Sequence, residues 1–310
     1  MNKAIIKRHV NEVRNLFINF KVYTYLKDKY REKIVLVTSA SIGDLVYLLS
    51  VLNNIKEEKC GNYILVCDKR KEYLVKQYNL KIAVEYYNLN TELGHAIFYN
   101  FNSSKWFGKL GKRCGIINTI PWVMYGFNDE ETISQLVEIL SLANGNIALQ
   151  FPKPSFISTI SSIDNYCQIK DKIVLINPYY ASEEKCEIYN ELKIITDNLI
   201  SKGFLVYCNV VNEQKAYPGT FPLRCDLDEL FKIANEIPYV ISVRSGILDY
   251  IASTQSKKIV IYPKSLPANW INSYSLTQWK VSNVIEINLH SKDSKKQIRE
   301  TLNGIKEYTK

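Results

Sequence analysis

The stretch KIVLVTSASIGDLVYLLSVL, residues 33–52, runs from a bare apolar segment into a helical pattern across a very short turn. A continuous apolar run such as 33–39 is typical of a strand buried on both faces of a parallel sheet. From Asp44 onward the apolar residues recur at helical spacing. A strand followed at once by a helix predicts an α/β layer, with Ser41 and Gly43 in the turn.

The same alternation continues along the chain. Further strands are predicted at 62–68, 81–87 and 95–100, and a helix is predicted at 131–145. A proline-containing linker at 151–156 precedes predicted strands at 172–178, 204–210, 239–245, 257–263 and 283–289, with helices between them and a loop through 218–222. We therefore expect two doubly wound, Rossmann-like α/β domains facing a cleft, at 33–150 and 151–310, after an N-terminal segment at 1–32.

Composition restricts the class of protein. At 310 residues the chain favours two domains, and its 46% hydrophobic and 23% charged residues are ordinary for a globular protein. No run of about 18 uncharged apolar residues predicts a membrane-spanning helix. The formal net charge of +9 predicts anionic partners. Because no zinc-finger, RRM-like or KH-like signature accompanies the basic residues, nucleic acid is not expected among them.

The cysteines and histidines predict neither a disulfide framework nor a metal site. Seven cysteines form no C-x-x-C pair and lie mostly in apolar runs, which is typical of buried, reduced thiols. The three histidines have no metal-ligand spacing. The first residues, MNKAIIKRHVNEVR, lack the pattern of a secretory signal. We therefore expect a cytoplasmic protein without a bound metal.

Three stretches place polar residues where a predicted strand ends. The first is Ser41-Ile42-Gly43-Asp44, which brings backbone N–H groups and a carboxylate to the carboxyl edge of the sheet. Gly43 would permit close approach of a ligand. The alternative is structural, since an acidic residue in the first turn of a helix is stabilised by the helix dipole.

The second stretch runs from Arg244 through Ser245 and Gly246 to Asp249. It combines a strand end, a turn of small residues and a helix start, which suits a phosphate group held by the Arg244 fork. Alternatively, Ser245 is a helix cap and Arg244 pairs with Asp249.

The third stretch, from Asn177 to Lys185, again passes from a strand through a loop into a helix start. Ser182 and Lys185 lie in it, and Lys185 could reach a diphosphate. The alternative is that Lys185 is solvated. His95, beside Gly94, could line the acceptor side, although a structural role is the simpler interpretation. Asp226-Leu227-Asp228 matches a metal-binding D-x-D motif, but it opens a helix, where acids serve as caps.

Together these stretches resemble a known family. The two-domain plan, the S-x-G-D turn, the proline-plus-Ser…Lys loop and the glycine turn near 245 are similar to heptosyltransferase-type glycosyltransferases of family 9, which have the GT-B fold. The resemblance covers about residues 33–265, and S-I-G-D is its most specific part. It implies that Asp44 is the base that deprotonates the acceptor hydroxyl, and that Lys185 contacts the donor phosphates.

The donor site departs from the family pattern. The family has an Asp-Ser/Thr-Gly turn followed by a histidine, where this chain has Arg244, Ser245 and Gly246 and then Asp249. We therefore expect UDP or GDP rather than ADP in the donor. Sugar transfer needs a base for the acceptor proton and cations for the leaving diphosphate, and both can come from side chains without a metal.

The function expected from these features is sugar transfer in cell-envelope glycan assembly. The chain would move a sugar, with inversion, from a nucleotide-diphosphate donor to a glycan or lipid-linked glycan acceptor of lipopolysaccharide, O-antigen or capsule. Two alternatives stay open: a GT-B-like nucleotide-sugar epimerase, and a non-catalytic protein that binds a nucleotide sugar or a partner enzyme.

The N-terminal segment is a basic, amphipathic helix by its pattern. Nine of residues 1–33 are Lys or Arg and three are acidic, while apolar residues recur at roughly helical spacing. Such a helix could lie on an anionic membrane surface, where a lipid-linked acceptor would be found. The alternative is that its apolar face packs on the first domain.

Overall fold

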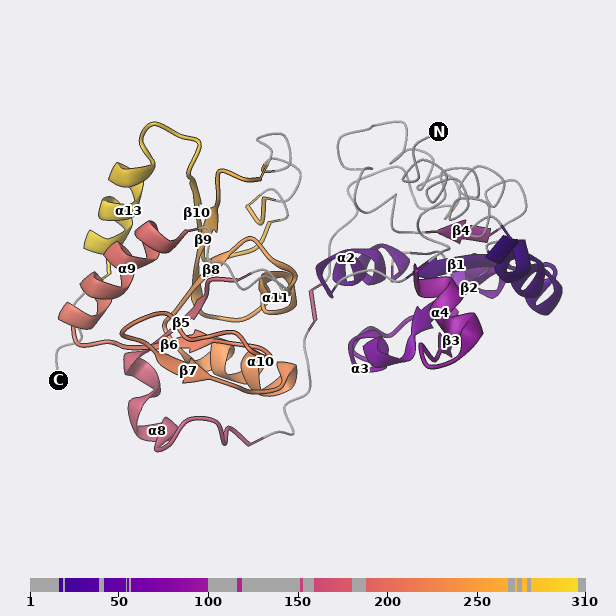
Figure 1. The fold of residues 1–310 in the computed structure, drawn as a ribbon, viewed down its shortest axis with the longest axis horizontal. Helices are drawn as coiled ribbons and strands as arrows, with labels where there is room; N and C mark the ends of the chain where they lie inside the picture. The colour runs from indigo at the N-terminus through magenta and orange to yellow at the C-terminus, as the bar shows by residue number, and fades with distance from the viewer. Residues whose placement is uncertain are drawn as a thin grey trace, which may run out of the picture. The chain divides into compact units, whose positions relative to one another are not determined.

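The computed structural model describes residues 17–18, 20–38, 42–53, 55, 57–99, 116–118, 151–152, 159–179, 188–266, 271, 275–277 and 280–305. The chain forms two compact units, Met1–Gln150 (unit 1) and Phe151–Lys310 (unit 2). Each unit is a parallel sheet with helices (Figure 1), so the predicted α/β class is confirmed. The helix predicted at 131–145 lies outside the described residues.

Unit 1 contains a four-stranded parallel sheet in the order β3-β2-β1-β4. Its strands are β1 (Ile34–Thr38), β2 (Tyr63–Asp68), β3 (Ala83–Tyr87) and β4 (Ile116–Asn118). Its helices are α2 (Ile42–Leu52), α3 (Glu72–Val75) and α4 (Glu92–Tyr99), with short 3-10 turns η1 (Glu57–Asn62) and η2 (Lys69–Lys71). The predicted passage from β1 into α2 is confirmed.

The strand predicted at 95–100 is wrong, because these residues belong to the helix α4. The Thr91 hydroxyl accepts a hydrogen bond from the Gly94 N–H at 3.0 Å, which is the arrangement of a helix N-cap. Ala96 and Ile97 lie on the buried side of this helix, and His95 lies on its exposed side. The fourth strand of the sheet is β4 instead.

A glycine is required at position 94. A Cβ atom there would lie 1.9 Å from the carbonyl oxygen of Asn88, so only glycine lets the chain return this closely after β3. The glycine beside His95 therefore has a packing role in the turn that starts α4.

The N-terminal helix packs on unit 1. Residues 20–30 are helical, and Val22 and Leu26 are buried in one cluster with strand residues of the sheet. Phe17 and Phe20 have exposed fractions of 69% and 59%. The helix therefore packs on the first domain through the face that carries Val22 and Leu26, which was the alternative to membrane docking. Phe17 and Phe20 are exposed to solvent.

Unit 2 contains six parallel strands in the order β10-β9-β8-β5-β6-β7. The strands are β5 (Ile173–Asn177), β6 (Leu205–Asn209), β7 (Phe221–Leu223), β8 (Tyr239–Val243), β9 (Lys257–Tyr262) and β10 (Val284–Asn288). The helices are α8 (Tyr166–Ile169), α9 (Tyr189–Ser201), α10 (Leu227–Glu236), α11 (Gly246–Tyr250) and α13 (Ser294–Asn303), with the 3-10 turn η4 (Lys170–Lys172). Five predicted strands are confirmed.

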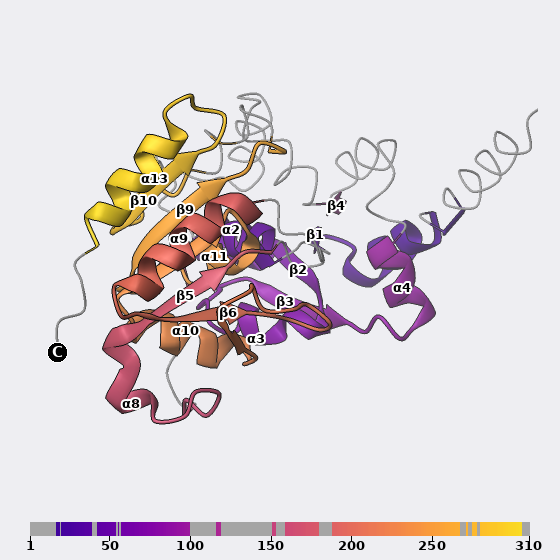
Figure 2. The same cartoon turned by 60° about the vertical axis from the view of Figure 1, so that its left-hand side comes forward.

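Helices cover both faces of this sheet. Alternate strand residues such as Val174 and Ile176 pack with α9 and α13 in one core cluster. In Figures 1 and 2, α9 and α13 lie side by side, and α10 and α11 lie on the other face of the sheet. The Lys202 ammonium, just after α9, donates to the carbonyls of Leu302 and Ile305 at 2.6 Å and thereby satisfies the C-terminal end of α13.

Two local features of unit 2 refine the predictions. The segment 218–222, predicted as a loop, contributes Phe221 and Pro222 to the edge strand β7, where a proline is tolerated because its missing N–H costs no ladder bond. The predicted helix end at Gly203 is confirmed. Gly203 has φ +84°, the left-handed conformation that glycine adopts without strain.

Candidate functional site

The carboxyl edge of the unit 2 sheet contains a point where the strand order reverses. From β5 the chain builds β6 and β7 on one side, and then β8, β9 and β10 on the other. The carboxyl ends of β5 and β8 are neighbours, with Asn177 beside Ser242 in the register. Open α/β sheets bind their ligands outside the strand ends at such a reversal. The predicted stretches after β5 and β8 therefore start from neighbouring strand ends, at the expected position for a ligand.

Arg244 and Asp249 form a buried ion pair at this edge. The Arg244 Nη2 and Asp249 Oδ1 atoms are 2.6 Å apart, and the side chains are only 6% and 7% exposed. Burial disfavours the charged guanidinium, but the Asp249 carboxylate outweighs that cost and raises the pKa of Arg244 above its ordinary value. The pair joins the turn after β8 to α11. The pairing of Arg244 with Asp249 was the alternative that the sequence left open, and the structure shows it. Contact of Arg244 with a donor phosphate stays a prediction.

Two polar side chains at the same edge have unused hydrogen-bonding atoms. Asn177, the last residue of β5, is 2% exposed, and neither polar atom of its amide has a hydrogen-bond partner among the described residues. Ser245 is 8% exposed, and its hydroxyl makes no cap bond to α11 and has no hydrogen-bond partner among the described residues. An unsatisfied buried polar group costs about 1–3 kcal/mol. Such groups are therefore expected where a ligand completes the bonding.

Asn177 was not singled out from the sequence as a site residue. The sequence feature that could have identified Asn177 is its position as the one polar residue, at the end of the otherwise apolar strand IVLIN.

Glu286 organises the neighbouring part of this edge. Its carboxylate accepts hydrogen bonds from the Tyr262 hydroxyl, the Ser275 hydroxyl at 2.7 Å, the Leu276 N–H at 2.8 Å and the Thr277 N–H at 3.3 Å. Burial alone would raise the pKa of Glu286, but these hydrogen bonds outweigh burial and lower it. Glu286 therefore ties residues 275–277 to β10. Its sequence signal was one acid inside the apolar strand VIEIN.

The D-x-D motif is a helix cap in the structure. The Asp226 carboxylate accepts the Glu229 N–H at 2.8 Å, and Asp228 accepts the Tyr250 hydroxyl at 2.8 Å. Among the described residues, no group of three His, Cys, Asp or Glu side chains is placed to hold a metal ion. The cysteines in that part of the chain form no disulfide; they are at 60, 67, 167, 208 and 225.

In unit 1, the structure places Gly43 and the backbone of Asp44 in the first turn of α2, directly after β1. The Asp44 side chain and Ser41 lie outside the described residues. The end of β1 is held in place, because the hydroxyl of Tyr87, the last residue of β3, donates to the carbonyl of Thr38, the last residue of β1, at 3.1 Å. Tyr87 was not identified from the sequence.

A second ion pair lies at the carboxyl end of β2. The Asp68 carboxylate, 2% exposed, accepts from Arg70 Nε at 2.9 Å and from Arg70 Nη2 at 2.6 Å. Burial lowers the pKa of the neighbouring Lys71. Lys69, Arg70 and Lys71 together place positive charge at the edge of the sheet from which α2 also starts.

Ser182 and Lys185 lie outside the described residues. His95 lies one turn into α4, exposed. None of the described helices is long and apolar enough to cross a membrane.

Comparison with known proteins gives structural but no sequence matches. No protein-family profile and no curated protein matches the chain. A family 9 glycosyltransferase from Veillonella parvula is similar at 14% identity over 89% of this chain and 94% of that chain, with a TM-score of 0.49. The E. coli heptosyltransferase WaaC, solved with ADP, is similar at 10% identity over 88% and 97%, with a TM-score of 0.49. The E. coli ADP-heptose lipopolysaccharide heptosyltransferase II is similar at 12% identity over 88% of this chain and 98% of that chain, with a TM-score of 0.49.

These solved structures belong to the class of transferase that the sequence resemblance names.

The ion pair at the unit 2 edge can be tested by a double-mutant cycle. Arg244→Met leaves the Asp249 carboxylate buried without its cation, so we expect the free energy of unfolding to fall by about 3–5 kcal/mol. Arg244→Met combined with Asp249→Leu removes both charges and should recover most of that loss. Chemical denaturation measures both variants.

The control is Lys193→Met, which breaks the exposed pair with Asp197 and should change stability little. A double variant as unstable as Arg244→Met alone would contradict the paired arrangement.

Proposed function

We propose that this chain is a metal-independent, inverting glycosyltransferase that moves a sugar from a nucleoside diphosphate to a cell-envelope glycan acceptor. The observation that carries the proposal is the pair of unsatisfied buried side chains, Asn177 and Ser245, at the strand-order reversal of unit 2. The resemblance around Asp44 and Lys185 supplies the reaction type.

Unit 2 is assigned to the donor. A nucleoside diphosphate offers phosphate oxygens to the Ser245 hydroxyl and the Asn177 amide, and its sugar hydroxyls can donate to the Asn177 oxygen. Lys185 is the proposed cation for the leaving diphosphate, whose developing charge must be stabilised as the glycosidic bond breaks. The Arg244–Asp249 pair holds the turn that carries Ser245.

Unit 1 is assigned to the acceptor. Asp44, in the first turn of α2, takes the proton from the attacking hydroxyl as the new bond to the sugar forms. The Tyr87–Thr38 hydrogen bond holds the end of β1, the strand that precedes α2 in the chain. The basic residues Lys69, Arg70 and Lys71 at the end of β2 favour an acceptor that carries negative charge, such as a phosphorylated glycan.

The role of Asp44 is tested by Asp44→Asn. The variant should fold and bind nucleotide while kcat falls by about 10²–10⁴-fold, the usual contribution of a general base. Single-turnover kinetics with a radiolabelled donor measures the chemical step. Asp28→Asn, an exposed carboxylate in the same unit, is the control and should keep full activity. Retention of more than half of kcat by Asp44→Asn would exclude the assignment.

Product analysis separates the alternatives. An epimerase would convert the nucleotide sugar without an acceptor, whereas a transferase releases nucleoside diphosphate only when the acceptor is present. A protein that only binds nucleotide sugars would show neither reaction. Activity in the presence of EDTA tests the absence of a metal requirement.

The donor assignment is tested by thermal stability with UDP, GDP, ADP, CMP and TDP. A ligand that binds only the folded state raises stability by about 2.7 kcal/mol at a hundredfold excess over Kd. We expect UDP or GDP to raise the melting temperature most, and an ADP preference would contradict the expectation drawn from the 244–249 turn.

Asn177→Leu sharpens this test. It removes unsatisfied polar atoms, so the free protein should be as stable as wild type or more so, while the nucleotide-dependent increase should be lost. The matched control is Asn198→Leu in α9, which also removes an unsatisfied buried oxygen but lies away from the carboxyl edge. Lys185→Ala should weaken nucleotide binding by about 1.5–3 kcal/mol. Unchanged nucleotide binding in both Asn177→Leu and Lys185→Ala would refute the donor site.

We also propose that the N-terminal helix docks on an anionic membrane. Because Val22 and Leu26 are buried in unit 1, the exposed Phe17 and Phe20 are the side chains available to lipid. Exposed basic residues accompany them, at 21, 27, 29, 31 and 33. Aromatic side chains beside basic residues are the combination that anionic lipid surfaces attract.

The docking proposal predicts that the full-length protein pellets with vesicles containing an anionic lipid, and that binding falls as salt is added. Phe17→Ser combined with Phe20→Ser should abolish pelleting without unfolding unit 1. Phe221→Ser, which removes a 50% exposed phenylalanine of unit 2, is the control and should pellet as wild type. A wild-type protein that stays in the supernatant at low salt would refute docking.

A further inference from the structure

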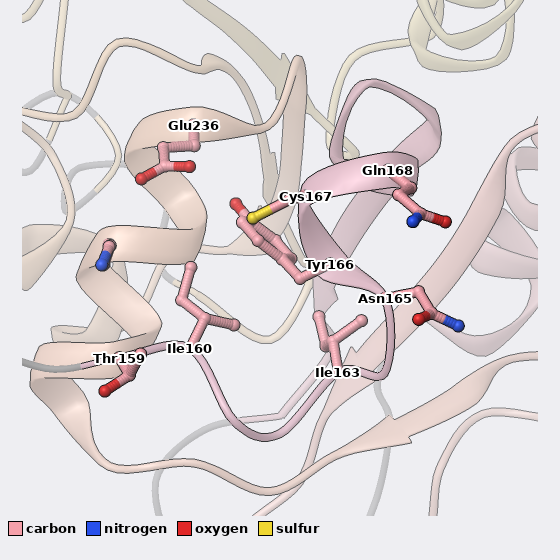
Figure 3. Close-up of a pocket in the computed structure, with 9 residues that line it drawn as sticks. Thr159, Ile160, Ile163, Asn165, Tyr166, Cys167, Gln168 and Glu236 are labelled. Carbon is pink, nitrogen blue, oxygen red and sulfur yellow. The ribbon is translucent and has the colours of Figure 1, made fainter.

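A separate cavity lies at the amino edge of the unit 2 sheet. Its volume is about 360 Å³, at the small end of the range of about 300–1,000 Å³ for ligand pockets. One wall is formed by the loop from Thr159 and by α8, and the other by the last turns of α10 at Lys232 and Glu236 (Figure 3).

This cavity is distinct from the proposed donor site. The helix α8 comes before β5, and Glu236 comes directly before β8, so the cavity lies where these strands begin. Asn177 and Ser245 lie where the same strands end. The two sites are therefore at opposite edges of one sheet.

One residue that lines the cavity, Tyr166, carries an unused hydrogen-bond donor. Tyr166 is 6% exposed, yet its hydroxyl has no hydrogen-bond partner among the described residues. Figure 3 shows this hydroxyl on the side of the Tyr166 ring that faces Glu236. Burial, together with the charge of Glu236, raises the pKa of Tyr166, so the hydroxyl stays protonated and can donate. A ligand that offers an acceptor would satisfy it.

The remaining lining groups define the ligand chemistry. Lys232 contributes a positive charge and Glu236 a negative charge, and Glu236 is also paired with Lys170 at 3.4 Å, so the lining carries charges of both signs. The amides of Asn165 and Gln168 can each donate and accept. Ile160 and Ile163 contribute an apolar surface. This combination fits a neutral molecule with several hydroxyl groups and an apolar C–H face.

We propose that this cavity binds one neutral sugar unit. Each sugar hydroxyl both donates and accepts, which matches the mixed lining, and the ring carbons can lie against Ile160 and Ile163. The inference does not depend on the transfer reaction at the opposite edge. A free monosaccharide and a sugar within a glycan share this chemistry.

The test is an amide-resolved NMR titration of the full-length protein with millimolar methyl glycosides of glucose, galactose, mannose and N-acetylglucosamine. We expect at least one to shift resonances at 159–168, 232 and 236 and to leave 177 and 245 unchanged. Short oligosaccharides of the bound sugar are titrated next. Their binding indicates a sugar unit within a glycan, because the cavity must then be open toward the rest of the glycan. Their exclusion indicates a free monosaccharide.

Tyr166→Phe is the decisive variant. It removes only an unsatisfied hydroxyl, so thermal stability should be retained, while sugar affinity should fall about 2- to 12-fold, the worth of one neutral hydrogen bond. The matched control is Lys170→Met. It breaks the 3.4 Å ion pair with Glu236. Because that change also alters the charge around Glu236, a second control is Lys193→Met, which breaks the exposed pair with Asp197 and involves no lining residue, so affinity should be kept.

Several results would overturn the inference. One is the absence of shifts with every neutral glycoside. Another is a clear preference for glucose 6-phosphate or glucosamine, which would make the cavity an anion or cation site. A third is equal sugar affinity for wild type and Tyr166→Phe. Because the nucleotide titration reports on Asn177 and Ser245, failure here is distinguishable from failure of the proposed donor site.

Discussion

Every described strand runs parallel to its neighbours, and the rest of the structure depends on this constraint. A parallel sheet needs helical crossovers, which cover both faces and leave the strands fully buried, as in β2 and β5. The strand residues are then mostly apolar, with Glu286 inside β10 as an exception, and the candidate site residues Asn177 and Ser245 lie where strands end.

At the carboxyl edge of unit 2, buried polar groups fall into two kinds. Arg244 and Asp249 pair with each other, and the partly buried Glu286 of β10 accepts from nearby donors, so these groups hold the surrounding segments in place. Asn177 and Ser245 are equally buried but keep unused atoms. Since burial without a partner is costly, the second kind is where we propose that a ligand binds, and the first kind holds the residues around it.

The same reasoning separates three surfaces of the protein. The amino edge of unit 2 contains one buried, unsatisfied hydroxyl, at Tyr166, beside charges of both signs. The end of β2 in unit 1 is basic, with Arg70 fixed by Asp68. The N-terminal helix combines a packed apolar side with exposed Phe17 and Phe20. These are the surfaces to which we assign the proposed neutral sugar, the proposed anionic acceptor group and the proposed lipid surface.

The sequence by itself determined the α/β class, most strands and the turn from β1 into α2, because apolar runs and helical spacing are local signals. It also identified Asp226 as a cap rather than a metal ligand. It failed at 95–100, where a short apolar run fits strand or helix and the Thr91 cap decided. Only the tertiary structure decided that β5 lies between β6 and β8, that Glu286 binds residues 275–277, and that Arg244 pairs with Asp249 while Asn177 stays unsatisfied. These contacts depend on which distant segments meet and on which polar atoms find partners when they do, and neither is encoded in local periodicity.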